Sequence, residues 1–173
     1  GSRDPWTSCR APRLCPSDGD LQDLHRILAG AQRGLVVIGT LSTDTERTAA
    51  DALARSLGWP IYADITSGLP GTLPLFDALL GAASIQSAAA PDVILHLGGP
   101  VVSKRYLCWL ADFPPTGHVV IRPDPARLDP AHCVTLQLTA HLAAIPLPGP
   151  LGAGNARLCA AGEAAREATA AII

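Results

Sequence analysis

Two adjacent basic residues, Lys104 and Arg105, are the side chains of this sequence best suited to bind a ligand. Lys104 is the only lysine among 13 basic residues, and all the others are arginine. We expect Ser103 to cap a helix that begins here, which places both cations in its first turn. Because the helix macrodipole is positive at that end, each cation there costs about 0.3–1 kcal/mol. Free N–H groups and two cations at one point predict a site for a carboxylate or phosphate. The alternative is that both side chains lie in solvent or pair with a nearby aspartate.

Three loops that follow expected strands could line a pocket around this pair. They comprise residues 39–43, 64–68 and 98–105. In an open α/β sheet, ligands bind outside the carboxyl ends of the strands, where such loops meet. Thr40, Asp64, Ser67 and Ser103 are therefore candidate lining residues.

Other familiar sites are not indicated by the sequence. The dinucleotide fingerprint needs three glycines and the first turn offers only Gly39, although Asp64 could stand where a ribose-binding acid lies. There is no nucleophile elbow and no Walker motif, and the histidines and cysteines lack metal-ligand spacing. His96 and His118 are predicted to be core residues with satisfied hydrogen bonds, and His132 could fix a loop. We therefore predict no catalytic residue and no metal site in this chain.

Short aliphatic runs alternate with helical patterns along the chain. Strands are expected at residues 34–39, 60–64, 92–97, 118–122 and 133–138, and helices at 21–28, 42–57 and 103–111. This alternation predicts an α/β fold with a Rossmann-like, doubly wound, mostly parallel sheet. Residues 69–90 show only a short apolar segment and an alanine-rich helix.

Length and composition predict one main domain. The chain has 173 residues, of which 48% are hydrophobic and 16% charged. We expect a cloning scar and linker at 1–20, an α/β central domain at 21–146, and a linker with a possible C-terminal helix at 147–173. The absence of methionine and the Gly1-Ser2 start predict a piece of a longer protein.

Charge and cysteine content narrow the function classes further. A net charge of −2 disfavours a nucleic-acid binder, and no apolar run reaches the ~20 residues that span a membrane. The five cysteines are expected to be free thiols in a reducing compartment, with a Cys9–Cys15 pair as the alternative.

A series of short motifs resembles a known family. Gly-Leu-Val-Val-Ile-Gly (34–39), Leu-Gly-Trp-Pro (57–60), Ala-Asp-Ile-Thr-Ser-Gly-Leu (63–69), Ser-Lys-Arg (103–105) and Arg-Leu-Asp-Pro-Ala-His (127–132) occur in this order. Over about residues 21–145 the series is similar to the central domain of SEPHCHC synthases (2-succinyl-5-enolpyruvyl-6-hydroxy-3-cyclohexene-1-carboxylate synthases). These are thiamine-diphosphate enzymes of menaquinone and phylloquinone biosynthesis. Residues 67–69 and 103–105 look closest to the plastid version, one module of a multifunctional phylloquinone-pathway protein.

The resemblance implies a function for the parent protein. The family's enzyme is a transferase that decarboxylates 2-oxoglutarate on thiamine diphosphate and adds the succinyl carbanion to isochorismate. The cofactor and magnesium lie between the two other domains, so this chain is expected to bind neither and to be inactive alone. The family's Lys-Arg pair holds substrate carboxylates, which assigns substrate binding to Lys104 and Arg105. Thr40 departs from the family, because many bacterial members have arginine there.

The resemblance also implies partners and a location. The partners would be the two other domains of the same enzyme, in a homo-oligomeric parent. The location would be the chloroplast for a plant or algal protein and the cytoplasm otherwise. Two alternatives stay open: a regulatory domain whose basic pocket binds an acidic pathway metabolite, less favourably a nucleotide, and a structural spacer between catalytic domains.

Overall fold

The computed structural model of the chain describes residues 7 and 12–171. Its core is one parallel sheet with strand order β2-β1-β3-β4-β5. The strands are β1 (Gly34–Ile38), β2 (Ile61–Ala63), β3 (Val93–Leu97), β4 (Gly117–Arg122) and β5 (Leu136–Thr139). The order reverses between β1 and β3, which is the topological switch point of a doubly wound sheet. The predicted fold class is confirmed.

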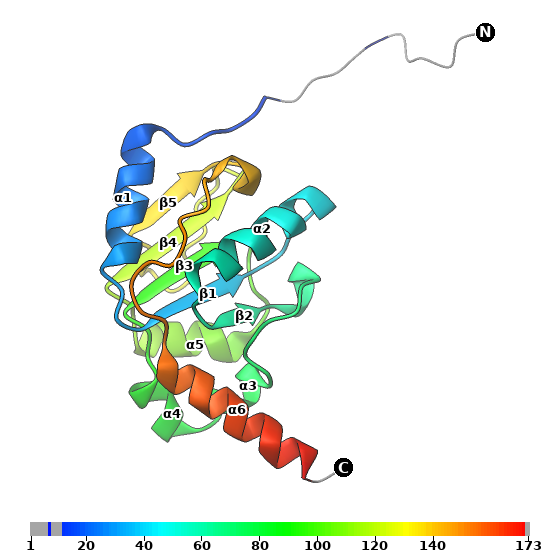
Figure 1. Cartoon of the computed structure of the whole chain (residues 1–173), viewed down its shortest axis with the longest axis vertical. Coiled ribbons are helices and arrows are strands. Elements are labelled where there is room, and N and C mark those ends of the chain that lie inside the picture. The colour runs from blue at the N-terminus through cyan, green and yellow to red at the C-terminus, as the bar shows by residue number, and fades with distance from the viewer. Residues whose placement is uncertain (1–6, 8–11, 172–173) are drawn as a thin grey trace, which may run out of the picture.

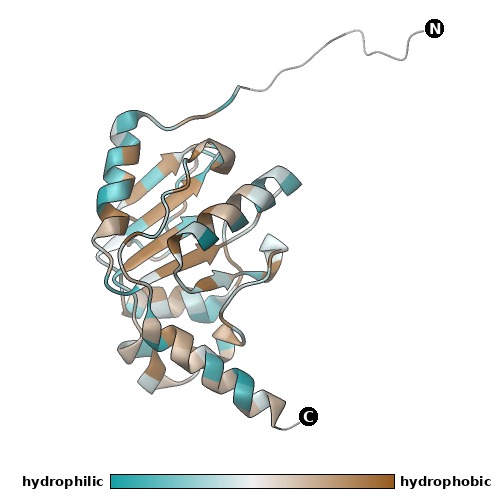
Figure 2. Ribbon diagram, in the orientation of Figure 1, coloured by the Kyte–Doolittle hydropathy of each residue, from teal (hydrophilic) through white to brown (hydrophobic). Residues whose placement is uncertain are grey.

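Helices cover both faces of this sheet (Figure 1). One face packs against α1 (Asp18–Ala29) and α2 (Asp44–Leu57), and the other against α3 (Phe76–Leu79), α4 (Ala83–Ala88), α5 (Lys104–Asp112) and α6 (Ala156–Ala170). Because successive side chains of a strand point to opposite faces, β1 supplies Val36 and Ile38 to the first core, and Leu35 and Val37 to the second. Figure 2 shows the result, with mainly hydrophobic central strands and helices that carry both hydrophilic and hydrophobic residues.

Side-chain caps set where the helices begin. Ser17 and Asp20 form a capping box that starts α1 at Asp18, three residues before the predicted start. Thr43 and Glu46 form the same motif at α2. The predicted cap of α5 is confirmed, because the Ser103 hydroxyl accepts a hydrogen bond from the Tyr106 N–H at 3.0 Å.

The segment before α6 is attached to the sheet. The Gly34 N–H donates to the Ala153 carbonyl at 2.8 Å, and the Trp59 indole N–H donates to the Leu151 carbonyl at 2.8 Å. Asn155 is fully buried, caps α6 through Leu158 and donates to the Ala89 carbonyl at 2.8 Å. The start of α6 is therefore held against the domain, while the predicted division at residues 146 and 147 stays a prediction.

Two further predictions concern cysteines and membranes. Cys15, Cys108 and Cys159 are exposed free thiols and Cys133 is a half-buried one, while Cys9 and Gly1-Ser2 lie outside the described residues. In the part of the chain that the structure describes, no helix is long and apolar enough to cross a membrane. Two short 3-10 turns, η1 (Ile65–Ser67) and η2 (Leu142–Ala144), complete the fold.

Candidate functional site

An open groove of about 840 Å³ lies beside the amino end of α5. Four of the predicted site residues line it: Asp64, Ser103, Lys104 and Arg105. The remaining lining residues come from β2, η1, the segment before and within α3, and the loop before α5; they are Tyr62, Ala63, Ile65, Leu73, Leu75, Phe76, Asp77, Ala78 and Val102. The groove thus lies between the end of β2, the start of α5 and a wall supplied by α3.

The basic pair stands in the first turn of α5, as the Ser103 cap requires. Arg105 donates from Nη1 to the backbone carbonyl of Asp77 at 3.0 Å, and the Ser103 hydroxyl donates to the Asp77 carboxylate. Lys104 and Arg105 are both exposed. Among residues 7 and 12–171, neither forms a salt bridge. The two cations therefore remain available to an anion in the groove.

Asp64 is the structural centre of the loops around the groove. It is only 2% exposed, and its carboxylate accepts hydrogen bonds from the Thr66 N–H (2.9 Å), the Thr66 hydroxyl (2.6 Å), the Val102 N–H (2.9 Å) and the Tyr62 hydroxyl (3.2 Å). Burial alone would raise the pKa of this carboxyl, but these hydrogen bonds outweigh it and hold the pKa below its ordinary value. Asp64 is ionised and ties the loop after β2 to the loop before α5.

Thr40 and Ser67 lie near this network but are not among the groove's lining residues. The Thr40 hydroxyl donates to the Pro100 carbonyl at 2.9 Å and lies 3.0 Å from the Thr66 hydroxyl. Ser67 is fully buried, donates to the Asp64 carbonyl at 2.6 Å and accepts from the Leu69 N–H at 3.1 Å. Both hydroxyls connect loops to one another.

Backbone pairing closes the crevice between the ends of β1 and β3. The Gly99 N–H donates to the Thr40 carbonyl at 2.8 Å, and the Thr40 N–H donates to the Pro100 carbonyl at 3.1 Å. A Cβ atom on Gly39 would lie 2.0 Å from the Gly99 carbonyl oxygen, so only glycine allows this approach. The turn after β1, where a dinucleotide pyrophosphate would bind, is covered by protein. The groove lies one strand away, at the end of β2.

The α3 wall contains site residues that sequence analysis did not single out. Asp77 contacts both Ser103 and Arg105, and nothing in the pattern of residues 69–90 pointed to it. Leu75, which precedes α3, adopts a left-handed conformation with φ of 52° and is 52% exposed. Such a conformation is unfavourable for a leucine and shows that the surrounding structure constrains the backbone at this wall of the groove.

The strand histidines differ from the prediction in one respect. His96 donates from Nε2 to the Gly99 carbonyl at 2.8 Å, so it is a satisfied core residue as predicted. His118 is 3% exposed and its Nδ1 lies 3.3 Å from the Cys133 Sγ, but its Nε2 has no hydrogen-bond partner within the described part of the chain. The prediction of a fully satisfied His118 is wrong, because α5 and the loop after β4 present mainly apolar side chains to this ring.

The loop-fixing role expected for His132 belongs to Asp129. The Asp129 carboxylate accepts from the Cys133 N–H at 2.8 Å and the Val134 N–H at 3.1 Å, and pairs with Arg127 at 2.6 Å. The His132 side chain is exposed and its backbone is left-handed, with φ of 54°. It is therefore the backbone of His132, and not its imidazole, that shapes the turn.

The described residues do not offer a site for a metal-bound diphosphate. Within residues 7 and 12–171, no three His, Cys, Asp or Glu side chains form a group that could hold a metal ion. In the groove itself, the Asp64 carboxylate is occupied by four hydrogen bonds and the Asp77 carboxylate accepts from Ser103. The donor set that remains is cationic, which suits a ligand carboxylate and not a magnesium ion.

Known proteins that are similar to this chain belong to the family that its motifs resemble. Residues 1–146 match the family described as "Middle domain of thiamine pyrophosphate". Curated relatives named 2-succinyl-5-enolpyruvyl-6-hydroxy-3-cyclohexene-1-carboxylate synthase include proteins of Chlorobaculum tepidum and Salinibacter ruber. The first is 38% identical over 160 residues, covering 86% of this chain and 27% of the relative. The second is 35% identical over 144 residues, covering 79% of this chain and 24% of the relative.

The chain spans about a quarter of the length of these relatives. The family match covers residues 1–146, which include the whole sheet and both sides of the groove. The sheet order and the motif series agree with that match. This chain belongs to the family of middle domains of thiamine pyrophosphate enzymes.

Proposed function

We propose that this chain is the substrate-contacting central domain of a SEPHCHC synthase, and that Lys104 and Arg105 hold substrate carboxylates in the groove. The observation that carries the proposal is the pair of exposed cations in the first turn of α5, where the helix itself disfavours them. The parent reaction decarboxylates 2-oxoglutarate and adds the product carbanion to isochorismate. Both substrates carry carboxylates, so cations that are costly to the isolated helix stabilise the bound state.

The two cations have different tasks in this proposal. One N–H of Arg105 is used by the Asp77 carbonyl, which orients the guanidinium and leaves its other donors for a carboxylate. Lys104 supplies a mobile point charge beside it. Asp77 is a positioning residue, because it acts on Arg105 and on the Ser103 cap. Thiamine diphosphate, bound by the other two domains, supplies the carbanion chemistry.

Apolar side chains around the groove support a contact with those domains. Ile65, Val102 and Leu75 are 87%, 65% and 52% exposed, and all three line the groove. Large apolar residues gathered at a polar site are typical of surfaces that another domain covers. In the assembled enzyme we expect the cofactor-binding domains to close over this edge of the sheet.

The decisive experiment is steady-state kinetics of the full-length enzyme with Lys104→Ala and Arg105→Ala. Loss of a charge-assisted contact of about 1.5–3 kcal/mol lowers kcat/KM for the affected substrate roughly ten- to a hundredfold. Arg33→Ala is the matched control, because Arg33 is exposed and lies just before β1, at the amino ends of the strands and therefore at the end of the sheet opposite to the groove. Unchanged kinetics in both basic-pair variants would overturn the binding role.

Titration of the 173-residue chain separates substrate binding from regulation. Calorimetry with 2-oxoglutarate, isochorismate and naphthoates is expected to show binding of the substrates, abolished by Arg105→Ala. Binding of a naphthoate but of neither substrate would favour a regulatory domain. No binding of any of these ligands, together with unchanged kinetics of the Lys104 and Arg105 variants, would favour a structural spacer. The isolated chain is expected to show no synthase activity.

The likeness of residues 67–69 and 103–105 to the plastid version extends the proposal to the parent protein. We infer a module of a multifunctional phylloquinone-pathway protein in the chloroplast. Reading the parental transcript tests this inference, because a multifunctional protein carries further enzyme modules in the same open reading frame. A parent limited to the three domains of a bacterial synthase would remove the plastid assignment and leave the groove's role intact.

A further inference from the structure

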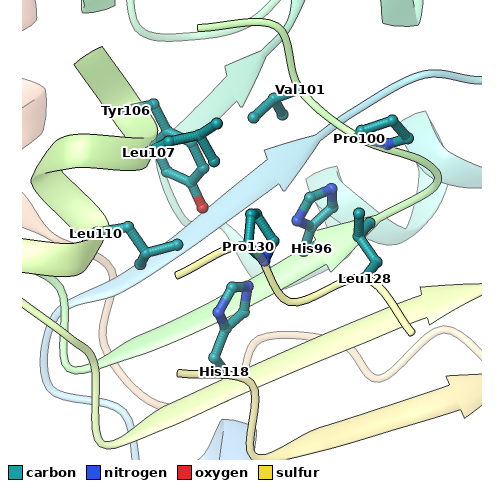
Figure 3. A pocket seen from close by; sticks show the side chains of 9 residues that line it. All are labelled: His96, Pro100, Val101, Tyr106, Leu107, Leu110, His118, Leu128 and Pro130. Carbon is teal, nitrogen blue, oxygen red and sulfur yellow. The ribbon is translucent and has the colours of Figure 1, made fainter. Parts of the chain in front are cut away.

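A second hollow, separate from the groove, lies under α5 on the same face of the sheet. It is a cavity of about 170 Å³ that shares no lining residue with the groove. Two thirds of its lining is apolar: Pro100, Val101, Leu107, Leu110, Leu128 and Pro130. Figure 3 shows how α5, strands β3 and β4, and the loop after β4 each contribute a side to it.

Two buried polar atoms at this cavity lack a hydrogen-bond partner among the described residues. They are the Tyr106 hydroxyl and the His118 Nε2, and no residue of the described chain forms a hydrogen bond with either. The Tyr106 side chain is 1% exposed and His118 is 3% exposed, and both line the cavity. In Figure 3 the tyrosine hydroxyl and the imidazole are directed into the same space. Buried polar atoms in native proteins are almost always hydrogen-bonded to protein or to ordered water, so two exceptions at one cavity indicate that a further polar group occupies it.

The cavity is electrically neutral. Burial lowers the pKa of His96 to about 4 and that of His118 to about 3, and burial raises the pKa of the Tyr106 hydroxyl. At neutral pH none of the three carries a charge. No Asp, Glu, Lys or Arg side chain lines the cavity, so a carboxylate, phosphate or ammonium group would lose its hydration here without a direct ion pair, which disfavours ionic ligands.

The hydrogen-bonding pattern selects a hydroxyl group. The His118 Nδ1 lies 3.3 Å from the Cys133 Sγ. If Nδ1–H donates to the sulfur, Nε2 is an acceptor, and if the thiol donates to Nδ1, Nε2 carries the hydrogen and is a donor. The Tyr106 hydroxyl can donate and accept. A ligand hydroxyl can also do both, and it therefore satisfies the two protein atoms with either tautomer of His118.

We propose that this cavity binds a neutral, compact, mostly apolar molecule of about one ring that bears a hydroxyl, held between Tyr106 and His118. Size agrees with this class of ligand, since an apolar cavity of about 150 Å³ accommodates benzene. The site goes beyond the function proposed for the groove, because it disfavours the anions that the groove attracts. A molecule bound here would contact α5, the helix that carries Lys104 and Arg105, because Tyr106 directly follows Arg105 in that helix.

Phenol is the probe that tests this site. Toluene, which lacks the hydroxyl, and benzoate, which carries a charge, are the comparison ligands. Using the 173-residue chain, verified as folded by a cooperative thermal transition, calorimetry should show saturable binding of one phenol. Phenol should bind roughly tenfold more tightly than toluene, and benzoate should not compete for the site. Absence of saturable phenol binding, or equal affinity for phenol and toluene, would overturn the proposal.

Variants locate the binding to the cavity. Tyr106→Phe removes one hydroxyl and should weaken phenol binding about fivefold while leaving toluene unchanged. Tyr62→Phe is the matched control, because the Tyr62 hydroxyl bonds to Asp64 beside the groove, and it should leave phenol affinity unaltered. Leu107→Trp, from its half-buried position, should block the site. If these variants fail to fold, NMR of the wild-type chain tests the location of binding through the amide chemical shifts that change when phenol is added. Changes at residues 96, 106, 118 and 128 support the site, and changes only elsewhere refute it.

Discussion

The groove and the cavity, which both border α5, differ in the hydrogen bonding and the charge of their polar side chains. In the groove, the buried Asp64 and Ser103 are hydrogen-bonded within the protein, and the charged Lys104 and Arg105 remain exposed. In the cavity, the described chain offers no partner to the Tyr106 hydroxyl or the His118 Nε2, and the surroundings are apolar. An open groove can display charge because water solvates it, whereas a charged group buried among apolar side chains loses that hydration. One helix thus borders two hollows of opposite chemistry.

Acid should affect the cavity side first. The folded pKa values of His96 and His118, about 4 and about 3, lie below the value of ~6.5 expected in the unfolded chain. Below pH ~6.5 the unfolded chain therefore binds protons that the folded chain does not. The stability that neutral burial provides is present above pH ~6.5 and is lost as the pH falls towards 4. Between pH 7 and pH 5 we expect a loss of about 3–4 kcal/mol in the free energy of unfolding.

Urea unfolding at the two pH values measures this loss. In His118→Gln the loss should fall to about half, since one of the two buried imidazoles is gone. Equal losses in the wild type and the variant would show that other groups cause the acid sensitivity.

On the groove side, Asp64→Ala should have the largest effect of any single change. Removing the carboxylate leaves the Val102 N–H and the Thr66 donors without their partner, and we expect a loss of about 3 kcal/mol in the free energy of unfolding. Asp51→Ala is the control, because Asp51 forms only a surface ion pair with Arg55 at 2.8 Å, and it should cost less than about 1 kcal/mol. Similar losses in the two variants, by urea denaturation at pH 7, would contradict a central role for Asp64.

Two tyrosine hydroxyls allow the hollows to be compared with the same substitution. Tyr62→Phe removes a hydroxyl that donates to Asp64 at 3.2 Å, and should lower the free energy of unfolding by about 1 kcal/mol. Tyr106→Phe removes a buried hydroxyl without a described partner, and should leave stability unchanged or raise it by up to about 1 kcal/mol. Thermal and urea unfolding of both variants test the difference in sign. A clear loss in Tyr106→Phe would indicate that its hydroxyl is already satisfied in solution.

The smallest effect concerns the basic pair itself. Lys104→Gln removes a cation from the first turn of α5 while keeping a similar helix propensity, and should raise the free energy of unfolding of the chain by about 0.3–1 kcal/mol. Arg33→Gln, at an exposed position outside any helix, should change it by less than about 0.5 kcal/mol. A loss of stability in Lys104→Gln would mean that Lys104 has a partner within the protein and is not available to a ligand.

Residues 69–90 show where sequence reasoning fails. The helices there, α3 and α4, have four and six residues, too few for a hydrophobic period to be recognised. Asp77 faces Ser103 and Arg105 from across 26 and 28 positions of the chain, and that contact has no local signature. The α5 side of the groove was predictable because a cap and the first turn after it are set by neighbouring residues.

By itself, the sequence determined the parallel sheet, the helix that starts after Ser103 and the position of Lys104 and Arg105 on it. These features depend on side-chain patterns within single elements. Only the tertiary structure decided that Gly39 and Gly99 close the crevice between β1 and β3, that Asp77 completes the groove, and that Tyr106 and His118 face one cavity. The reason is physical: each of these depends on how separate elements pack, and the packing of distant segments is a property of the whole fold.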